Sequence, residues 1–175
     1  MTGSDREAPP IPPNRPSLTA GSPYPGSVLR PLLVTLAVTA TLVGSPGAAN
    51  AGPAAEYAER AVKATNTARE ANHRKPLKVD ECLRDFARKQ AQAMADAEEM
   101  YHQELRPIME TCHLVSVGEN VAYGYPTGRS VVNRGWMRSE GHRANILSRG
   151  FKLVAVAARR DDDGTWYAAQ VFGRR

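Results

Sequence analysis

The chain has 175 residues, with 23 Lys or Arg, 18 Asp or Glu and a net charge of +5 at neutral pH. A positive charge of this size affects solubility and weak association. No Lys/Arg cluster interleaved with aromatic residues accompanies it, so the composition excludes a typical nucleic-acid-binding surface. The length permits a single domain of ordinary size, and local patterns then decide how the chain is organised.

The first part of the chain is not typical of a folded domain. Residues 1–27 hold many Pro, Gly and Ser residues and few large apolar side chains. Such a segment cannot bury enough apolar surface to offset the entropy that it loses on ordering, so we expect it to be disordered.

The next segment has the order of a secretory signal peptide. Arg30 precedes an uncharged apolar run over 31–43, and the small-residue triplet Ala49-Asn50-Ala51 follows. The run is shorter than the roughly 20 apolar residues of a membrane-spanning helix, which makes an uncleaved anchor the weaker alternative. We therefore expect export, cleavage after Ala51 and no stable membrane span after processing. On this basis residues 1–51 are a leader plus signal peptide and residues 52–175 are the mature domain.

Apolar periodicity predicts helices in the first part of the mature domain. Apolar side chains recur every three or four residues over 56–72 and over 80–96, and Asp80 is a suitable N-cap for the second segment. Shorter helical segments are expected near 107–112 and over 118–124. A third substantial helix is expected over 130–138, with Val131, Val132 and Trp136 facing inward.

The end of the chain changes to β character. Residues 153–157 and 165–172 are rich in β-branched and aromatic side chains, and the dipeptide Asp163-Gly164 lies between them. This arrangement predicts a β-hairpin. Helices followed by an antiparallel pair of strands indicate an α+β fold, with the hairpin packed under the helices.

Both cysteines, Cys82 and Cys112, belong to the predicted mature domain. In an oxidising compartment, two cysteines most simply form one disulfide. The alternative is a pair of unconnected buried thiols.

The chain has four histidines, His73, His102, His113 and His142, and their spacing in the sequence does not mark any of them as a metal ligand. No pair stands at a metal-binding spacing such as H-x-x-x-H, so any site they form must be assembled by the tertiary fold. Two other positions, Glu119 and Gly141, have structural explanations. A carboxylate at Glu119 would be favoured at the head of a short helix by the helix dipole, and Gly141 would suit a helix C-cap.

Three strings resemble the bacterial secreted branch of the CAP superfamily, which unites cysteine-rich secretory proteins, antigen 5 allergens and plant pathogenesis-related proteins. They are GENVAYG at 118–124, WMRSEGHRANIL at 136–147 and WYAAQVFG at 166–173. Asn66 and Arg69 also match the N-x-x-R of the family's first helix. The resemblance implies an α-β-α sandwich with a small three-stranded antiparallel sheet between helical layers. It places the third strand somewhere in 110–118.

The resemblance also implies a central cleft with two histidines and two acidic residues. Carried over to this chain, these are His102, Glu119 and His142, with Glu140 as the second acid. Ser139 occupies the place where animal and plant members have that acid, one position before Glu140. Because one residue rotates a helical side chain by about 100°, Glu140 either supplies the missing carboxylate or points to solvent.

Two imidazoles with one or two carboxylates would suit Zn²⁺, which takes N and O ligands and leaves a position for water. In that interpretation His102 and His142 ligate the ion, and Glu119 ligates it or orients a histidine. The alternative is that these polar groups satisfy one another and hold the cleft in shape without metal.

The resemblance implies a secreted binding module, at or outside the cell wall, that is not an enzyme. Its expected partner is a cell-envelope polymer, a lipid or a protein, and a monomer is expected. A second hypothesis is a secreted hydrolase, which would use a zinc-bound water with Glu119 as base, or Ser139 with His142. A third is a purely structural envelope protein.

Overall fold

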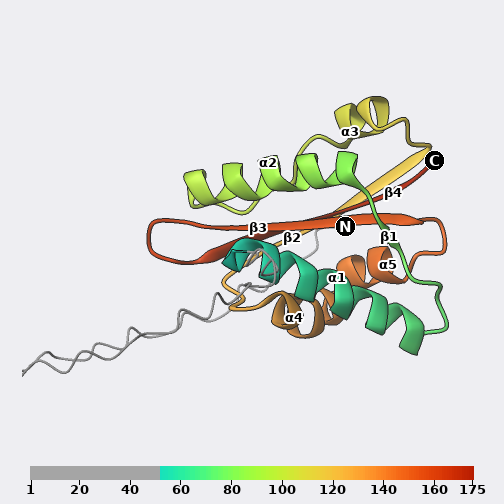
Figure 1. Ribbon diagram of the computed structural model, residues 1–175, viewed down its shortest axis with the longest axis horizontal. Coiled ribbons are helices and arrows are strands. Elements are labelled where there is room, and N and C mark those ends of the chain that lie inside the picture. Colours follow the sequence, from blue (N-terminus) through green and yellow to red (C-terminus); the bar gives the residue numbers. More distant parts are fainter. Residues whose placement is uncertain (1–51) are drawn as a thin grey trace, which may run out of the picture. The chain divides into compact units, whose positions relative to one another are not determined.

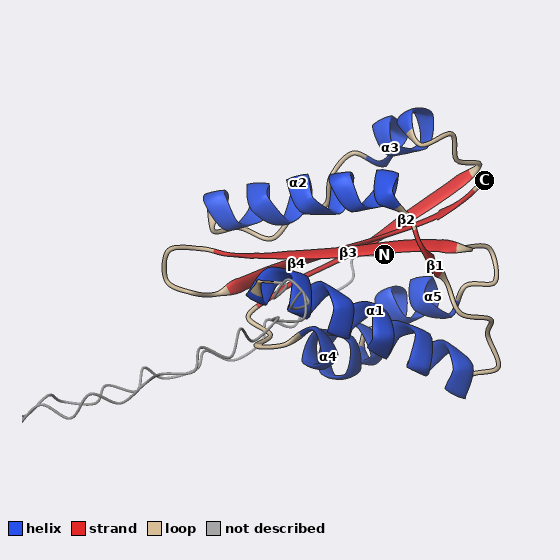
Figure 2. Cartoon of the chain, in the orientation of Figure 1, coloured by secondary structure: helices blue, strands red, loops and turns tan. Residues whose placement is uncertain are grey.

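The computed structural model describes residues 52–175, and the predicted leader and signal peptide lie outside the described residues. A β-sheet lies between two helical layers, with α2 and α3 on one face and α1, α4 and α5 on the other (Figures 1 and 2). The predicted α+β sandwich is thus confirmed. In chain order the elements are α1 (Pro53–Ala71), β1 (Lys78–Val79), α2 (Glu81–Ala97), α3 (Leu105–Thr111), β2 (Ser116–Tyr123), α4 (Gly128–Ser130), the π-helical turn η1 (Val131–Gly135), the 3₁₀ turn η2 (Trp136–Arg138), α5 (Glu140–Leu147), β3 (Leu153–Arg160) and β4 (Trp166–Arg174).

The sheet has the order β1-β3-β4-β2, with β3 and β2 each antiparallel to β4. The predicted hairpin is confirmed as β3 and β4, which are longer than the segments predicted from sequence. The three long strands form the antiparallel sheet that the resemblance implies. An unexpected fourth strand, β1, adds two residues parallel to β3 and makes the sheet mixed.

Each face of the sheet packs on its own hydrophobic core. Along β3, Val154 faces α1 while Ala155 faces α2, and along β4 the neighbours Phe172 and Val171 divide in the same way. This is the two-residue alternation of a strand. Because both faces are buried, the strands are nearly continuous apolar runs in the sequence.

The start of α2 is fixed by a cap and by the predicted disulfide. The Asp80 carboxylate accepts a hydrogen bond from the Leu83 N–H at 3.1 Å and another from Arg175 at 2.7 Å, which confirms the predicted N-cap. Burial by itself raises the pKa of Asp80, but the hydrogen bonds from Arg175 and from backbone N–H groups outweigh it and lower the pKa. Cys82 and Cys112 are bonded, with their Cα atoms 5.8 Å apart, so the beginning of α2 is tied to the residue after α3.

The prediction of a helical turn over 118–124 is wrong, because those residues belong to β2 and to the turn after it. Glu119 is therefore not at the head of a helix. Gly141 does not cap a helix C-terminus either, since it lies in the first turn of α5. In the first case the pairing of β2 with β4, about 50 residues further along the chain, decides the conformation, and the local sequence does not reveal it.

The helix predicted over 130–138 is helical but irregular. It consists of the end of α4 followed by η1 and η2, and the predicted inward residues Val131, Val132 and Trp136 are at most 1% exposed. A Cβ atom at Gly128 would lie 1.9 Å from the Tyr57 carbonyl oxygen, so only glycine lets α4 start this close to α1. Within residues 52–175, no helix has the length and apolar character needed to span a membrane.

Candidate functional site

The candidate site is built around β2, which lies at an edge of the sheet and pairs only with β4. Successive residues of a strand point to opposite faces, so Glu119 turns toward the α2 and α3 layer while Asn120 turns toward the α1 and α5 layer. The loop over 98–104, between α2 and α3, brings His102 to the first face. His142 comes from α5, on the second. The two predicted histidines therefore come from elements on opposite faces of the sheet.

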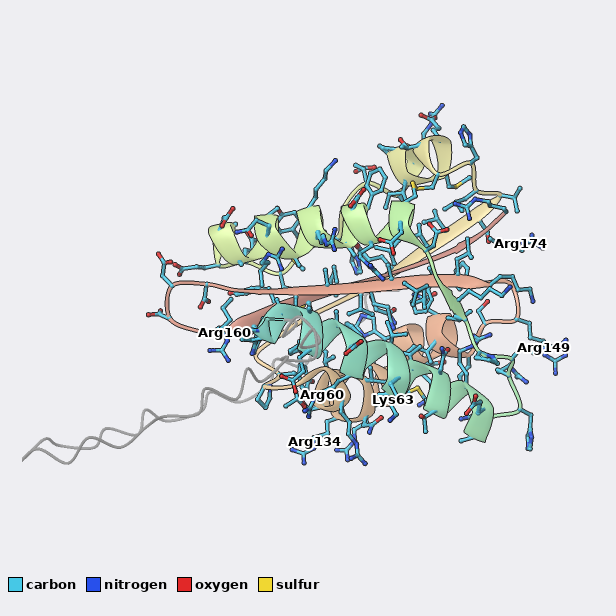
Figure 3. The ribbon with its side chains drawn as sticks, in the orientation of Figure 1. Arg60, Lys63, Arg134, Arg149, Arg160 and Arg174 are labelled. Carbon is cyan, nitrogen blue, oxygen red and sulfur yellow. A yellow bond between two sulfur atoms is a disulfide. The ribbon has the colours of Figure 1, made fainter. Side chains whose placement is uncertain are left out.

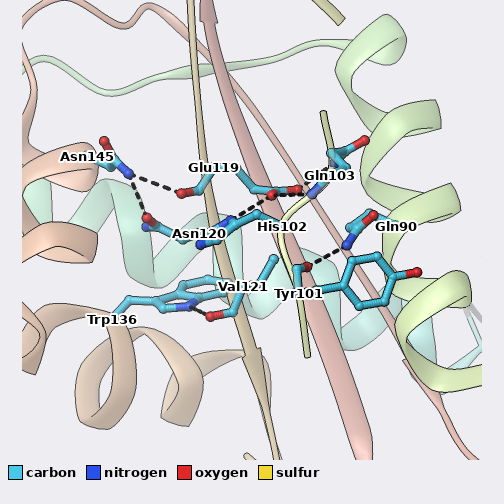
Figure 4. A network of polar contacts seen from close by, with 9 residues as sticks. All are labelled: Gln90, Tyr101, His102, Gln103, Glu119, Asn120, Val121, Trp136 and Asn145. Carbon is cyan, nitrogen blue, oxygen red and sulfur yellow. Dashed lines mark hydrogen bonds and ion pairs between the residues drawn. The ribbon is translucent and has the colours of Figure 1, made fainter. Parts of the chain in front are cut away.

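The Glu119 side chain is 1% exposed, and three hydrogen-bond donors surround its carboxylate (Figure 4). His102 Nδ1 lies 2.8 Å from Oε2, with the ring nitrogen as donor. The backbone N–H and the side-chain amide of Gln103 also donate, at 3.2 Å and 2.5 Å. A buried carboxylate is costly unless it is hydrogen-bonded, and these donors meet that need.

The same contacts anchor the loop over 98–104. Gln103 and His102 fix one end to Glu119, and the Gln90 amide donates to the Tyr101 carbonyl oxygen at 2.6 Å (Figure 4). The loop exposes Met100 by 43% and Tyr101 by 41%, and the His102 side chain by 59%. Two large apolar side chains and an imidazole are thus exposed on a loop that hydrogen bonds with Gln90 and Glu119 hold in place.

On the other face of β2, Asn120 is the centre of a buried polar network. Its amide donates to the His142 carbonyl at 3.2 Å and to Gln170 Oε1 at 3.0 Å, and its oxygen accepts from Asn145 at 2.9 Å. Gln170 in turn donates to Thr65 Oγ1 at 2.8 Å. Asn120, Gln170 and Thr65 are completely buried, so the bonds that join these three side chains form out of water. The network joins α1, β4, β2 and α5.

Side chains also cover the outer edge of β2. Glu119 and Val121 direct their backbone carbonyls away from β4. Asn145 donates to the first at 3.1 Å, and the Trp136 indole N–H donates to the second at 3.0 Å (Figure 4). An uncovered strand edge presents unpaired backbone groups that can pair with other chains, and these two side chains remove that opportunity.

The structure brings two of the four predicted cleft residues, His102 and Glu119, into direct contact. The backbone of His142 accepts from Asn120, its side chain is half-buried, and Glu140 is exposed at the first position of α5. Asn145 and Asn120 lie inside the strings that carried the resemblance, and sequence reasoning gave them no role. Thr65 carries no local signal.

Too few suitable side chains lie together in the structure to hold a zinc ion. Among residues 52–175 no group of three or more His, Cys, Asp or Glu side chains is arranged to hold a metal. The pair of His102 and Glu119 alone resembles a ligand and the carboxylate that orients it. The described residues do not fit a ready-made zinc site, and zinc binding stays a prediction.

Asn66 and Arg69, the residues of the N-x-x-R match, hold the molecule together away from the candidate site. The Asn66 amide exchanges two hydrogen bonds with the backbone of Leu77. Arg69 is 2% exposed and donates to the carbonyls of Lys75, Ile146 and Ser148, which fixes the end of α5 against α1. Burial, followed by the nearby Arg74, lowers the pKa of Arg69. This motif is therefore structural in the chain.

Comparison with known proteins gives consistent matches. The sequence model of the cysteine-rich secretory protein family matches residues 62–172. An uncharacterized protein of Bacillus subtilis is 32% identical over an alignment of 143 residues, which covers 78% of this chain and 52% of that protein. The chain thus spans about half the length of this relative.

Solved structures give the same fold. One is an extracellular protein of Bacillus anthracis that contains an SCP domain, with 25% identity, a TM-score of 0.59 and coverage of 68% of this chain and 40% of that protein. Another is an outer surface protein of Borrelia burgdorferi, with 18% identity, a TM-score of 0.59 and coverage of 65% of this chain and 89% of that protein. At 18% identity the second match supports the fold alone.

Proposed function

The chain belongs to the cysteine-rich secretory protein (CAP) family, and from this membership we propose that it acts as an exported, non-catalytic binding module at or outside the cell wall. Export is supported by the signal-peptide pattern that ends at Ala51, although that segment lies outside the described residues. The solved relatives from B. anthracis and B. burgdorferi are described as an extracellular protein and an outer surface protein.

The observation that carries a binding role is the state of Glu119. A general base must be able to reach the proton that it removes. The Glu119 carboxylate is instead 1% exposed and accepts hydrogen bonds from His102 and Gln103. Its role in this arrangement is to position the loop over 98–104.

The same loop is the proposed binding surface. It presents Met100, Tyr101 and His102 on a backbone that Gln90 and Glu119 hold in place. Aromatic and Met side chains are enriched where proteins bind partners, and a loop that is already ordered loses little entropy on binding. A cell-envelope polymer, a lipid or a protein remain the proposed classes of partner.

Binding to isolated cell walls, lipid vesicles and casein tests the proposal. We expect the protein to be retained by cell walls or vesicles and to leave casein intact. The double variant Met100→Ala/Tyr101→Ala should weaken retention at least tenfold, whereas Val115→Ala, which removes an exposed apolar side chain outside the loop, should not. Cleavage of casein that disappears in Glu119→Gln would contradict a non-catalytic role and support the hydrolase. The absence of all binding and cleavage would favour the purely structural protein.

Zinc binding is tested by calorimetric titration of the wild type, His102→Ala, His142→Ala and His73→Ala. We expect zinc affinity to fall in acid, because a metal binds only the neutral imidazole. Loss of binding in the first two variants, with retention in His73→Ala, would place a zinc ion at β2. Equal binding in all three variants would place any zinc elsewhere. Adding Glu140→Ala shows whether that exposed carboxylate belongs to the site.

A further inference from the structure

The opposite edge of the sheet, along β3, is covered only at its start. β1 pairs with Leu153 and Val154 and then ends, because the chain turns into α2. The Asp80 N–H donates to the Val154 carbonyl at 3.1 Å, which shows that Val154 directs its backbone groups to this edge. Backbone groups alternate along a strand, so Val156 and Ala158 point the same way, beyond the end of β1.

These outward groups are largely without partners. Arg159 donates to the Ala158 carbonyl at 3.0 Å. Within the described part of the chain we find no hydrogen-bond partner for the N–H and C=O of Val156 or for the N–H of Ala158. Val156 is 3% exposed, and buried backbone groups of this kind cost free energy until they are paired.

A groove of about 620 Å³ runs along this bare edge, between α1 and α2. Its volume is within the usual range for ligand pockets, roughly 300–1,000 Å³. Small apolar side chains form much of its lining, namely Ala54, Ala58, Val62, Val79, Val156 and Ala157. No residue of the loop over 98–104 lines it, so the groove is a surface separate from the proposed binding loop.

The charges of the lining are unequal. It contains four cationic side chains, Lys63, Arg84, Arg88 and Arg159, and one acidic side chain, Glu59. Arg84 and Arg88 also pair with Glu81 and Asp85 along α2, but those carboxylates are 75% and 67% exposed, and such pairs are weak. Lys63 is exposed on α1 (Figure 3). The groove thus favours a negatively charged occupant.

We propose that this groove binds an acidic peptide segment in extended conformation, which adds to the sheet beside β3 in the line of β1. Strand addition of this kind uses backbone hydrogen bonds for affinity and side-chain pockets for specificity. An extended peptide supplies the N–H and C=O groups that Val156 and Ala158 lack, whereas an acyl chain supplies none. Residues 31–51 of the chain itself carry no charge, so this segment lacks the acidic side chains that would pair with the cationic lining of the groove.

The binding test uses the full chain and fluorescent peptides of roughly six residues, the usual length of a strand. One peptide alternates Glu with Val, a second replaces each Glu by Lys, and a third repeats the first with alternate backbone nitrogens methylated. We expect the first to bind in fluorescence anisotropy and the other two to bind at least tenfold more weakly. Lys63→Ala/Arg88→Ala should weaken the first peptide at least fivefold, and Arg134→Ala, an exposed arginine on η1, should not (Figure 3).

Amide hydrogen exchange gives a second readout that does not depend on charge. The acidic peptide should slow exchange at Val156 and Ala158 but not at Ala155, which pairs with β4. Equal binding of the methylated peptide, or unchanged exchange at Val156, would overturn strand addition. Displacement of the peptide by a fatty acid with higher affinity would assign the groove to a lipid instead. None of these results bears on the loop over 98–104, so this proposal and the proposed function fail separately.

Discussion

The two edges of the sheet meet the same physical problem in different ways. At the β2 edge, side chains of Trp136 and Asn145 donate to the outward carbonyls, and the buried amide of Asn120 holds α5 in place. At the β3 edge, β1 covers two residues and Arg159 donates to one further carbonyl. The polar residues of the recognisable strings therefore serve mainly to close one edge, and the edge that stays open is the one without such a string.

Removing the centre of the closed edge should have the largest effect. Asn120→Ala removes the hydrogen bonds with Gln170, Asn145 and the His142 carbonyl at a position that is completely buried. At about 1–3 kcal/mol for each buried unpaired group, with partial relaxation, we expect a loss of roughly 3–4 kcal/mol in the free energy of unfolding. Urea denaturation measures it. A loss below ~1 kcal/mol would mean that the network does not hold the β2 edge.

Removing one side-chain hydrogen-bond donor at the β2 edge tests how firmly that edge is closed, and the same change is made at the β3 edge below. Trp136→Phe keeps an aromatic ring but removes the indole N–H, so the Val121 carbonyl is left unpaired. We expect a loss of about 1–2 kcal/mol in urea denaturation. Equal stability of wild type and variant would show that water or a neighbouring side chain replaces the indole.

The elements around the open β3 edge could be predicted from the sequence better than those around the closed β2 edge. Asp163-Gly164, the Asp80 cap and the Cys82–Cys112 pair are local or compositional signals, and the structure confirms each. The resemblance places the third strand in 110–118, whereas β2 is Ser116–Tyr123. The local sequence predicts a helical turn over most of β2, because the polar Asn120 stands at an inward position and obscures the alternation of a strand. That position is polar because Gln170, 50 residues away, completes its hydrogen bonds.

A similar limit applies to the candidate site. The resemblance indicated His102 and Glu119, which the structure brings together. It also indicated His142, whose backbone carbonyl accepts a hydrogen bond from Asn120 on the other face of β2. Thr65 and Gln170 could be found only from the fold, because each is an ordinary polar residue on an otherwise apolar face.

Asp80 lies where β1 ends and the β3 edge becomes uncovered, and the pH dependence of stability tests what its charge contributes there. The folded pKa of Asp80 is lowered, so the ionised carboxylate stabilises the protein above its ordinary unfolded pKa. That contribution is lost as the pH falls through the lowered folded value. Asp80→Asn can still cap α2, and we expect it to cost roughly 0.5–1 kcal/mol at pH 7. The difference from wild type should close in acid, well below the ordinary carboxyl pKa of about 3.9. A difference that stays constant with pH would mean that the charge is not responsible.

The smallest effect is expected at the open edge. Arg159→Ala removes the donor to the Ala158 carbonyl and a hydrogen bond to Gln92. Because this side chain borders a groove that can admit water, we expect a change within about 0.5 kcal/mol. An effect as large as that of Trp136→Phe would show that the β3 edge is closed as firmly as the β2 edge, and it would remove the contrast.

The disulfide gives the exposed loop a tolerance to cleavage. Cys82 and Cys112 close a covalent ring around the whole segment from α2 to the end of α3, and the loop over 98–104 lies inside it. Exposed loops are where proteases cut first. A cut between Met100 and Tyr101 would leave both fragments joined through the ring. Gln90 would still donate to the Tyr101 carbonyl across the cut, and Gln103 would still donate to Glu119. Outside a cell, where proteases are present and damaged chains are not replaced, a nicked molecule of this design would keep its shape.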